Sequence, residues 1–250
     1  MGIIDAFDSQ SEEILKPSCI AAPVEGFPKT VIVTFQPDLT DILKSLFPVE
    51  IVRTMDSGVQ VPVYRFWYKG RSLGLYLTTI GGPAAVGLME EVLVKGAEKV
   101  LFFGACGVLD RTITAGRLIL PTAAYRDEGT SYHYLPPSDY VEIPTAGRLG
   151  EIFQELQVPY VYGRTWTTDA IYRETRNNTE ARRREGCVAV EMECASVMAA
   201  GQFRGVPVYQ FLYAEDSLDG PAWEARSWHG VPRSAYEKYL QIALETAVRL

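Results

Sequence analysis

Continuous apolar runs alternate along the chain with longer segments in which apolar residues recur every three or four positions. The runs at 29–35, 100–103 and 206–214 are rich in branched and aromatic residues, which is typical of strands that are covered on both faces. The segments 86–96 and 235–250 show the spacing of amphipathic helices. This order predicts an α/β fold in which a largely parallel or mixed sheet lies between layers of helices.

The first 28 residues differ from this pattern, because they carry three prolines and charges of both signs. We expect residues 1–28 to form an N-terminal arm, with a short helix at Ser11–Lys16. Residues 29–250 contain neither an internal repeat nor a linker, and their length suits one domain with a sizeable core. The predicted organisation is therefore an arm followed by a single α/β domain.

The segment 188–200 combines a buried strand, two carboxylates and a buried helix. Residues 194–200 are small or apolar on every side of a helical wheel, which is typical of a helix inside a domain. Glu191 and Glu193 therefore lie at a buried strand–helix junction, with Met192 between them. An unpaired buried carboxylate is costly or takes up a proton, so each needs a partner. A ligand rich in hydroxyl groups would serve, and so would a structural arginine or the N–H groups at the helix start.

Other predicted strands also end in polar or glycine-rich residues. Ligands of open α/β sheets bind at the carboxyl ends of strands, so exits that share one edge would outline a single pocket, with Trp166 and Tyr172 as aromatic neighbours. The two glycine-rich exits match neither nucleotide-binding fingerprint, and tight turns explain them equally well. The exits are Gly81-Gly82, Gly104–Gly107, Thr167–Asp169, Glu191–Glu193 and Glu215-Asp216.

Charge and composition argue against several classes of function. The net charge of −7 and the isoelectric point near 5 disfavour a nucleic-acid partner, which requires a basic face. The four cysteines lack metal-binding spacing and only His133 and His229 are present, so we expect neither disulfides nor a zinc site. We expect a cytoplasmic protein, because no signal peptide is visible and no apolar stretch approaches the roughly 18 to 20 residues that span a bilayer.

Four segments, taken in order, resemble the hexameric-type purine nucleoside and uridine phosphorylases. The most specific of them is the Val-Glu-Met-Glu stretch at a fitting distance before Asp216, and the resemblance covers roughly residues 30–216. It implies a three-layer α/β/α domain whose central mixed sheet is partly barrel-like. It also implies a homo-oligomer, a dimer or a hexamer, that binds a nucleoside and phosphate without a cofactor or metal. The segments are Thr78–Pro83, Gly104–Gly107, Thr168–Tyr172 and Val190–Glu193.

The resemblance also assigns roles to individual residues. Met192 and Glu193 would hold the ribose, with Glu191 alongside. Asp216 falls where purine-cleaving members carry their catalytic acid, and Arg226 would assist it. Such proton transfer is worth about 10²–10⁴-fold in rate, and it requires a carboxyl pKa raised by burial or a neighbouring carboxylate. The base would be lined by Ala105, Cys106, Gly107, Ile171 and Tyr172, and the phosphate by Gly81, Gly104, Ala105 and Arg53.

The phosphate site departs from the family pattern. Family members bind phosphate with a Gly-Asp-Pro-x-Arg turn after the first strand, and with an Arg and a Ser or Thr near the second glycine loop. The corresponding residues here are 35–39, Phe102 and Ala105. None of them is a cation, and Asp38 adds a negative charge. A phosphate dianion binds poorly without cations, so Arg53 from a neighbouring subunit or Arg126 would have to replace them.

Three functions remain open at this point. The first is a purine-leaning nucleoside phosphorylase, since Thr175 and Asn177 stand where the family reads uracil. The second is a nucleosidase of the same fold that uses water; the missing arginines favour it, but the glutamate-rich turn of the hydrolytic relatives is also missing. The third is a nucleoside-binding protein without turnover. The presence of Glu193 and Asp216 counts against this third reading, unless Asp216 is only a helix N-cap.

Overall fold

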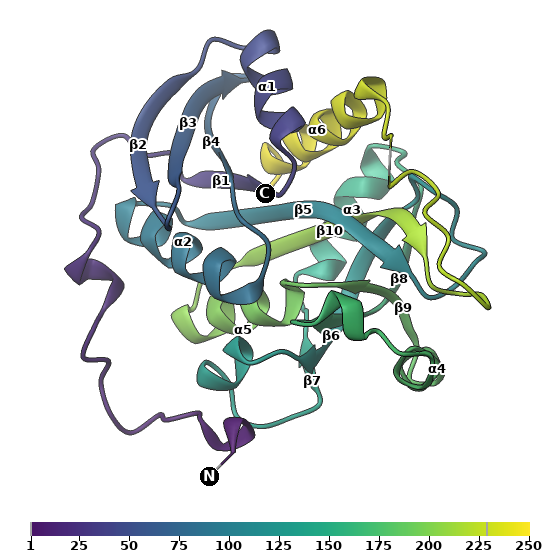
Figure 1. Cartoon of the computed structure of the whole chain (residues 1–250). Coiled ribbons are helices and arrows are strands. Elements are labelled where there is room, and N and C mark those ends of the chain that lie inside the picture. Colours follow the sequence, from purple (N-terminus) through teal and green to yellow (C-terminus); the bar gives the residue numbers. More distant parts are fainter. Residues whose placement is uncertain (1, 229) are drawn as a thin grey trace.

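A computed structural model describes residues 2–228 and 230–250, so Met1 and His229 lie outside the described part of the chain. Within that part the strands form one mixed sheet in the order β10-β6-β8-β9-β5-β1-β4-β3-β2, and β7 pairs with β6. Because β10 also pairs with β5, the strands β5, β10, β6, β8 and β9 close into a ring (Figure 1). The mixed, partly barrel-like sheet that the resemblance implies is confirmed.

The elements have the following bounds. The strands are β1 (Thr30–Thr34), β2 (Glu50–Asp56), β3 (Gln60–Tyr68), β4 (Arg71–Leu77), β5 (Lys99–Val108), β6 (Leu118–Asp127), β7 (Tyr140–Glu142), β8 (Tyr160–Thr168), β9 (Cys187–Glu191) and β10 (Val208–Ser217). The helices are α1 (Pro37–Leu46), α2 (Gly82–Lys95), α3 (Ala146–Glu155), α4 (Arg176–Arg184), α5 (Cys194–Arg204) and α6 (Arg233–Ala247). Short 3-10 helices are η1 (Ile3–Asp5), η2 (Pro17–Cys19), η3 (Thr130–His133) and η4 (Ile171–Arg173).

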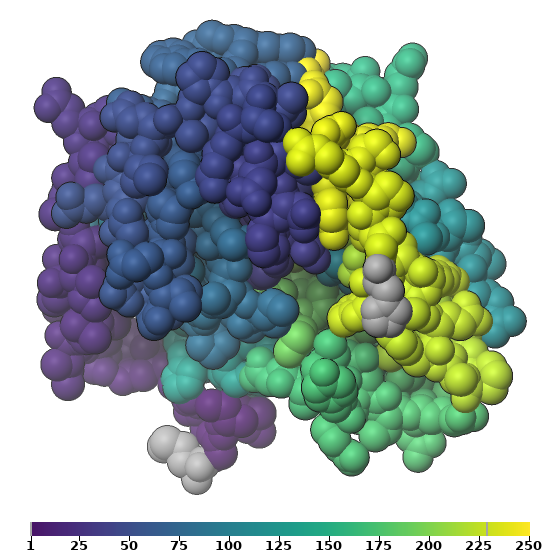
Figure 2. Space-filling view, turned by 45° about the horizontal axis from the view of Figure 1, so that its top comes forward, coloured from purple at the N-terminus to yellow at the C-terminus, as the bar shows by residue number. Residues whose placement is uncertain are grey.

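Helices cover both faces of the sheet and give the three predicted layers. α2 and α5 lie side by side on one face, and their small and apolar residues share one core cluster with β1 and β5 (Figure 1). On the other face α1 lies against α6 (Figure 2). A second core cluster joins these two helices and α3 to the sheet. The N-terminal ends of α2 and α5 both lie near the middle of the molecule, where β4 and β9 end.

Two strands run further than the apolar pattern predicts. β5 continues through the whole of Gly104–Gly107, and β10 continues through Glu215 and Asp216. Gly107 explains the first extension, because a Cβ there would lie 2.6 Å from Leu218 Cδ1 and 3.1 Å from Val190 Cγ1. The glycine therefore allows close packing inside paired strands, and the expected loop at this exit is wrong.

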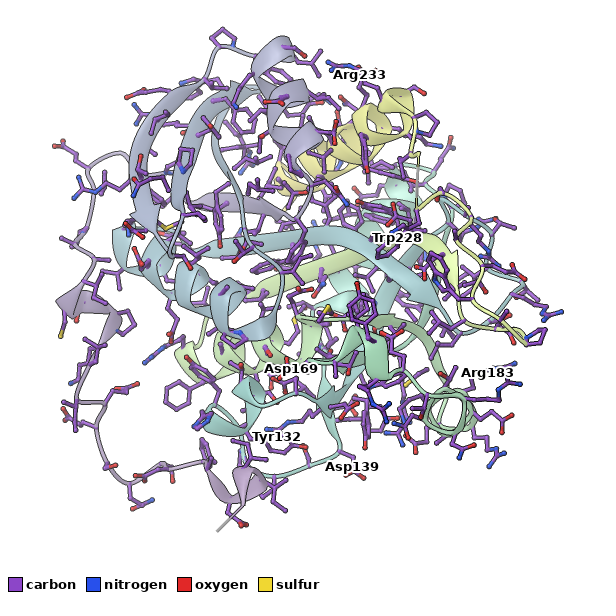
Figure 3. All side chains as sticks on the ribbon, in the orientation of Figure 1. Tyr132, Asp139, Asp169, Arg183, Trp228 and Arg233 are labelled. Carbon is purple, nitrogen blue, oxygen red and sulfur yellow. The ribbon has the colours of Figure 1, made fainter. Side chains whose placement is uncertain are left out.

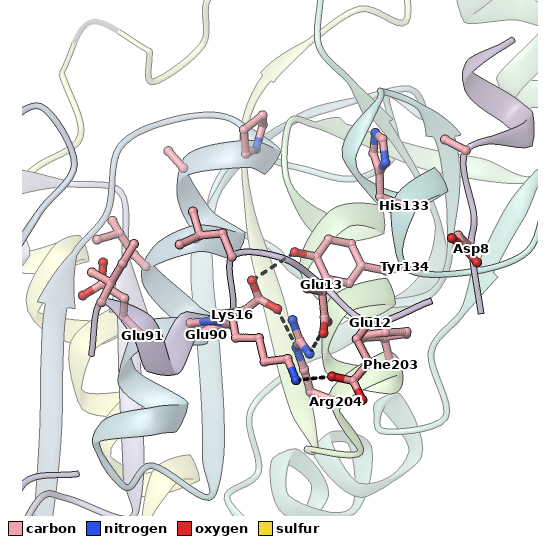
Figure 4. A pocket seen from close by; sticks show the side chains of 18 of the residues that line it. Asp8, Glu12, Glu13, Lys16, Glu90, Glu91, His133, Tyr134, Phe203 and Arg204 are labelled. Atoms are coloured by element: carbon pink, nitrogen blue, oxygen red, sulfur yellow. Dashed lines mark hydrogen bonds and ion pairs between the residues drawn. The ribbon is translucent and has the colours of Figure 1, made fainter. Parts of the chain in front are cut away.

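The N-terminal arm lies across α2 and α5 and contains no helix at Ser11–Lys16, so that expectation is also wrong. Isolated helices of this length are unstable in water, and these residues are largely exposed. Arg204 on α5 holds the arm through Glu13 at 2.8 Å and also pairs with Glu90 at 2.6 Å (Figure 4). The arm encloses a cavity of about 690 Å³ that none of the predicted site residues lines.

Gly82 fixes the contact between the starts of α2 and α5, and its replacement tests that contact. A Cβ at Gly82 would lie 2.9 Å from the Cβ of Ser196, which is fully buried. We expect Gly82→Ala to lower the free energy of unfolding by about 1–3 kcal/mol, as overpacking does. Gly87→Ala on the same helix is the control: nothing lies within 4 Å of its Cβ, so it should stabilise by up to about 1 kcal/mol. Urea unfolding of both variants measures the difference, and equal effects would contradict the packing argument.

Candidate active site

Glu193 is buried at the junction between β9 and α5. Its Oε1 accepts a hydrogen bond of 2.6 Å from the backbone N–H of Gly81, the N-cap residue of α2. This bond joins the starts of the two helices. Burial, followed by the charge of Glu191, raises the pKa of Glu193 to about 8. A carboxyl group in this state is strongly stabilised in its ionised form by any ligand that donates hydrogen bonds to it.

The carboxylate of Glu191 accepts its hydrogen bonds from groups of the protein. Its carboxylate accepts the backbone N–H groups of Glu193 at 2.8 Å and Cys194 at 2.6 Å, and the hydroxyl of Thr167 at 2.6 Å. Of the three partners that the sequence leaves open for this residue, the helix-start N–H groups are therefore the ones found. Glu191 positions Glu193 and has no free side for a ribose.

Asp216 lies at the end of β10, next to the end of β9 across one strand. Gly107 of β5 pairs with Val190 on one side and with Asp216 on the other. The Oδ1 of Asp216 lies 3.3 Å from the position of a Cβ on Gly107, so the missing side chain leaves room for the carboxylate. Its Oδ2 accepts a 2.6 Å hydrogen bond from the indole N–H of Trp223. Because Asp216 lies inside β10, it is not the N-cap of a helix.

Burial raises the pKa of Asp216 above its ordinary value, against the lowering effect of the Trp223 hydrogen bond and of the Arg226 charge. Burial and the charge of Asp216 raise the pKa of Glu215 to about 7 and that of Glu174 to about 7. These carboxyl groups hold protons at a higher pH than ordinary acids do. The site is therefore suited to proton donation near neutral pH.

Arg226 is close enough to Asp216 to lower its pKa, but it is engaged elsewhere. Its Nη1 donates to the carbonyl of Ile113 at 2.8 Å, and its Nε lies 3.8 Å from Glu224. Its backbone has a φ of +45°, which a residue other than glycine seldom adopts. The structure thus places Arg226 beside the predicted acid without a direct ion pair between them.

The predicted base-binding residues are only partly brought together. Ala105 is half-buried on the same strand as Gly107, and Ile171 is 37% exposed. The thiol of Cys106 is buried and faces the carbonyl of Tyr213 at 3.6 Å, so the side chain belongs to the core. Tyr172 is 95% exposed. The alternation of side chains along a strand explains why Cys106 faces away from its two neighbours.

The predicted phosphate residues lie in an apolar corner. A Cβ on Gly104 would lie 2.8 Å from the ring of Phe35, whose centroid is 6.3 Å from that of Phe102. Arg126 is buried and donates to the carbonyls of Pro136 and Leu135 and to nearby hydroxyls, so its guanidinium is already used.

Arg53 is exposed on the edge strand β2, and its side chain forms no ion pair with any residue in 2–228 or 230–250. It lies in the part of the sheet furthest from β9 and β10 in strand order. Within one chain, neither Arg126 nor Arg53 therefore offers a free guanidinium to a phosphate at Gly104 and Ala105.

Two residues of the site carried no clear signal in the sequence. The charged run that begins at Glu174 is typical of a surface helix, yet Glu174 is half-buried and α4 begins only at Arg176. Trp223 lies in the loop after β10, where its ring packs edge-on against Trp228 with centroids 5.9 Å apart. Trp228 is labelled in Figure 3. Aromatic residues in the loop after an acidic strand exit were the one available sign.

Two further features are absent from the described residues. No helix in 2–228 or 230–250 is long and apolar enough to cross a membrane. In the same ranges, no group of three or more His, Cys, Asp or Glu side chains is placed to hold a metal ion.

The chain is similar to several known proteins. A family model described as the phosphorylase superfamily matches residues 28–247. The chain is 28% identical over 198 residues to an uncharacterized protein of Acanthamoeba polyphaga mimivirus, covering 79% of this chain and 78% of that protein. It is 30% identical over 146 residues to the guanosine phosphorylase of Halorubrum lacusprofundi, covering 56% of this chain and 58% of that protein. The crystal structure of uridine phosphorylase from Vibrio fischeri ES114 matches with a TM-score of 0.76 at 24% identity, over 98% of this chain and 100% of that one.

Proposed function

Because the chain belongs to the phosphorylase superfamily, we propose that it cleaves the N-glycosidic bond of purine nucleosides and transfers the ribosyl group to phosphate. One observation carries the proposal: Gly107 pairs with both Val190 and Asp216. Neighbouring strands lie about 4.8 Å apart, so the junction that holds Glu193 and the acid Asp216 are within the span of one nucleoside. The similarity to a guanosine phosphorylase supports a purine substrate.

In this proposal Glu193 accepts hydrogen bonds from the ribose hydroxyls, and Met192 packs against the sugar. The bond between C1′ and N9 breaks, and its electron pair goes to the purine. Asp216 gives its proton to N7 and so neutralises the charge that develops on the leaving base. A phosphate oxygen forms the new bond to C1′, which yields ribose 1-phosphate and the free base. Asp216 regains a proton from solvent before the next turnover.

The residues around Gly104 are apolar, so we propose that the cations that bind the phosphate come from another subunit. We propose that the protein is a homo-oligomer, a dimer or a hexamer, in which Arg53 of one copy serves the site of its neighbour. The exposure of Arg53 and its lack of an ion pair among the described residues support this role. No cofactor or metal enters the proposed reaction.

A hydrolytic nucleosidase is the second candidate, and one observation favours it. The corner formed by Phe35, Phe102, Gly104 and Ala105 offers no positive charge, while several carboxyl groups lie nearby. A dianion is disfavoured in such a field. In the hydrolytic reaction, water supplies the oxygen that bonds to C1′ and loses a proton to solvent, while Asp216 still protonates the base.

Guanosine cleavage with and without phosphate separates the two candidates. We expect guanine and ribose 1-phosphate to appear in phosphate buffer, and no base release in a phosphate-free buffer, because the new bond to C1′ requires a phosphate oxygen. Chromatography of the base and an assay for free ribose follow both products. Equal guanine release without phosphate, with free ribose as the other product, would reject phosphorolysis and establish the nucleosidase.

A further inference from the structure

A cavity of about 210 Å³ lies against α6, between the loops that precede β6 and β8, and we call it the α6 cavity. Its wall is formed by residues 114–118, 158–159, 238–239 and 242. It adjoins β10, because Tyr239 of the wall stacks on Tyr213 with ring centroids 4.2 Å apart. None of the residues predicted for the active site lines the α6 cavity, so the two places are separate.

The α6 cavity is positively charged, although the whole protein carries a net charge of −7. Arg117 and Lys238 line it, and among the described residues its wall contains no aspartate or glutamate. Neither of these two side chains forms a hydrogen bond or an ion pair with a residue in 2–228 or 230–250. A half-buried guanidinium without a counterion is unfavourable, so the environment of Arg117 favours a bound anion.

Tyr239 adds a hydrogen-bond donor to the two cations. It is 6% exposed, and its hydroxyl forms no hydrogen bond within the described part of the chain, although buried hydroxyl groups are normally paired. Burial, followed by the charge of Glu215, raises the pKa of Tyr239, so the hydroxyl keeps its proton at neutral pH and can donate it. Gly116 leaves room beside this hydroxyl, because a Cβ there would lie 3.1 Å from the phenol oxygen.

We propose that the α6 cavity binds the doubly charged oxyanion of a phosphate group. Its oxygens can accept hydrogen bonds from Arg117, Lys238 and Tyr239 together, and hydrogen bonds between a guanidinium or ammonium group and a phosphate are strong. The cavity is smaller than the roughly 300–1,000 Å³ of pockets for drug-sized ligands, so it suits the phosphate group and not a whole nucleotide. This inference does not rest on the function proposed above.

Calorimetric titration of the full chain with inorganic phosphate and with glycerol 3-phosphate tests the α6 cavity. The variant Arg117→Ala/Lys238→Ala should bind phosphate there at least about tenfold more weakly, because charge-assisted hydrogen bonds are lost. Tyr239→Phe keeps the ring that stacks on Tyr213 and loses one hydroxyl, so it should weaken binding by about 3- to 10-fold. In crystals soaked with selenate, we expect an anomalous peak between Arg117 and Lys238.

Two matched controls separate the α6 cavity from general effects of charge and of phenol removal. Tyr236→Phe removes a hydroxyl from the same helix, outside the wall of the cavity. Arg71→Ala/Arg184→Ala removes two exposed positive charges, one on β4 and one on α4. Both controls should leave the phosphate affinity unchanged. Phosphate bound at the candidate active site should be unchanged in every one of these variants.

Unchanged phosphate affinity in Arg117→Ala/Lys238→Ala and in Tyr239→Phe, or an equal loss in the charge control, would overturn the proposal. Absence of selenate from the α6 cavity would do the same. Binding of glycerol 3-phosphate as well as inorganic phosphate would uphold the proposal and identify a phosphorylated metabolite as the ligand. Binding of inorganic phosphate alone would uphold it and identify the free ion. These outcomes hold whether or not the protein cleaves nucleosides.

Discussion

Asp216→Asn should lower kcat/KM for guanosine by about 10²–10⁴-fold, the usual contribution of a positioned general acid. Asparagine keeps the shape of the side chain and can still accept the indole N–H of Trp223 at the atom where Asp216 accepts it. It has no proton to give to N7, so the charge on the leaving base stays uncompensated. Initial rates of guanine release, measured with saturating phosphate, give the comparison.

Glu215→Gln is the matched control, since it changes the neighbouring carboxyl group on the same strand. The charge of Glu215 contributes to raising the pKa values of Tyr213 and Tyr239, beyond the larger effect of their burial, so this carboxyl lies near those rings. We expect less than a tenfold effect on kcat/KM from this control, small beside a general-acid loss. A near wild-type rate for Asp216→Asn, or an equal loss in both variants, would remove Asp216 from its role.

The pH dependence of kcat/KM is a second test of Asp216→Asn. Burial raises the pKa of Asp216, so its acid form persists to higher pH than that of an exposed aspartate. We expect kcat/KM of the wild type to fall as the pH rises through this pKa, because the proton donor is lost. The residual rate of Asp216→Asn should lack that limb of the profile.

Glu193→Gln should lower kcat/KM for guanosine by roughly 100-fold, because a hydrogen bond to a charged group contributes about 1.5–3 kcal/mol. Glutamine still accepts the N–H of Gly81, so the contact between α2 and α5 is kept. The variant loses the negative charge of the carboxylate, which strengthens its hydrogen bonds from the ribose hydroxyls. Steady-state kinetics on guanosine measure the change, and urea unfolding checks that the variant remains folded.

2′,3′-Dideoxyguanosine supplies the control, because it lacks the hydroxyl groups that Glu193 is proposed to hold. In the wild type this substrate should react much more slowly than guanosine. In Glu193→Gln the difference between the two substrates should largely disappear, as expected when the partners of one interaction are removed together. An undiminished preference for guanosine in the variant would show that the ribose is held elsewhere.

The sequence predicts the layers of the fold well, because long apolar runs and helical spacing decide them. It fails where local pattern and tertiary contacts disagree. β2 is missed because six of its seven residues are exposed or half-buried, as on an edge strand without a clear alternation. The continuation of β5 through Gly107 is missed because glycine usually marks a turn, whereas here it makes room for Leu218 and Asp216.

The site is predictable in its carboxylates and less so in its surroundings. Glu191 and Glu193 stand out in the sequence, but only the hydrogen bonds separate a structural cap from a free acceptor. The orientation of Cys106 depends on the register of β5 against β9 and β10, which no local pattern reports. Glu174 lies near enough to Asp216 for the charge of Asp216 to raise its pKa. The two residues are brought together by the closed ring of strands, which no local pattern predicts.

A crystal structure with bound 9-deazaguanosine tests the central claim most directly. The account predicts ribose hydroxyls within about 3 Å of the Glu193 carboxylate and the N7–H of the same molecule within about 3 Å of Asp216. A nucleoside that contacts one of these carboxylates while the other faces a separate space would contradict it.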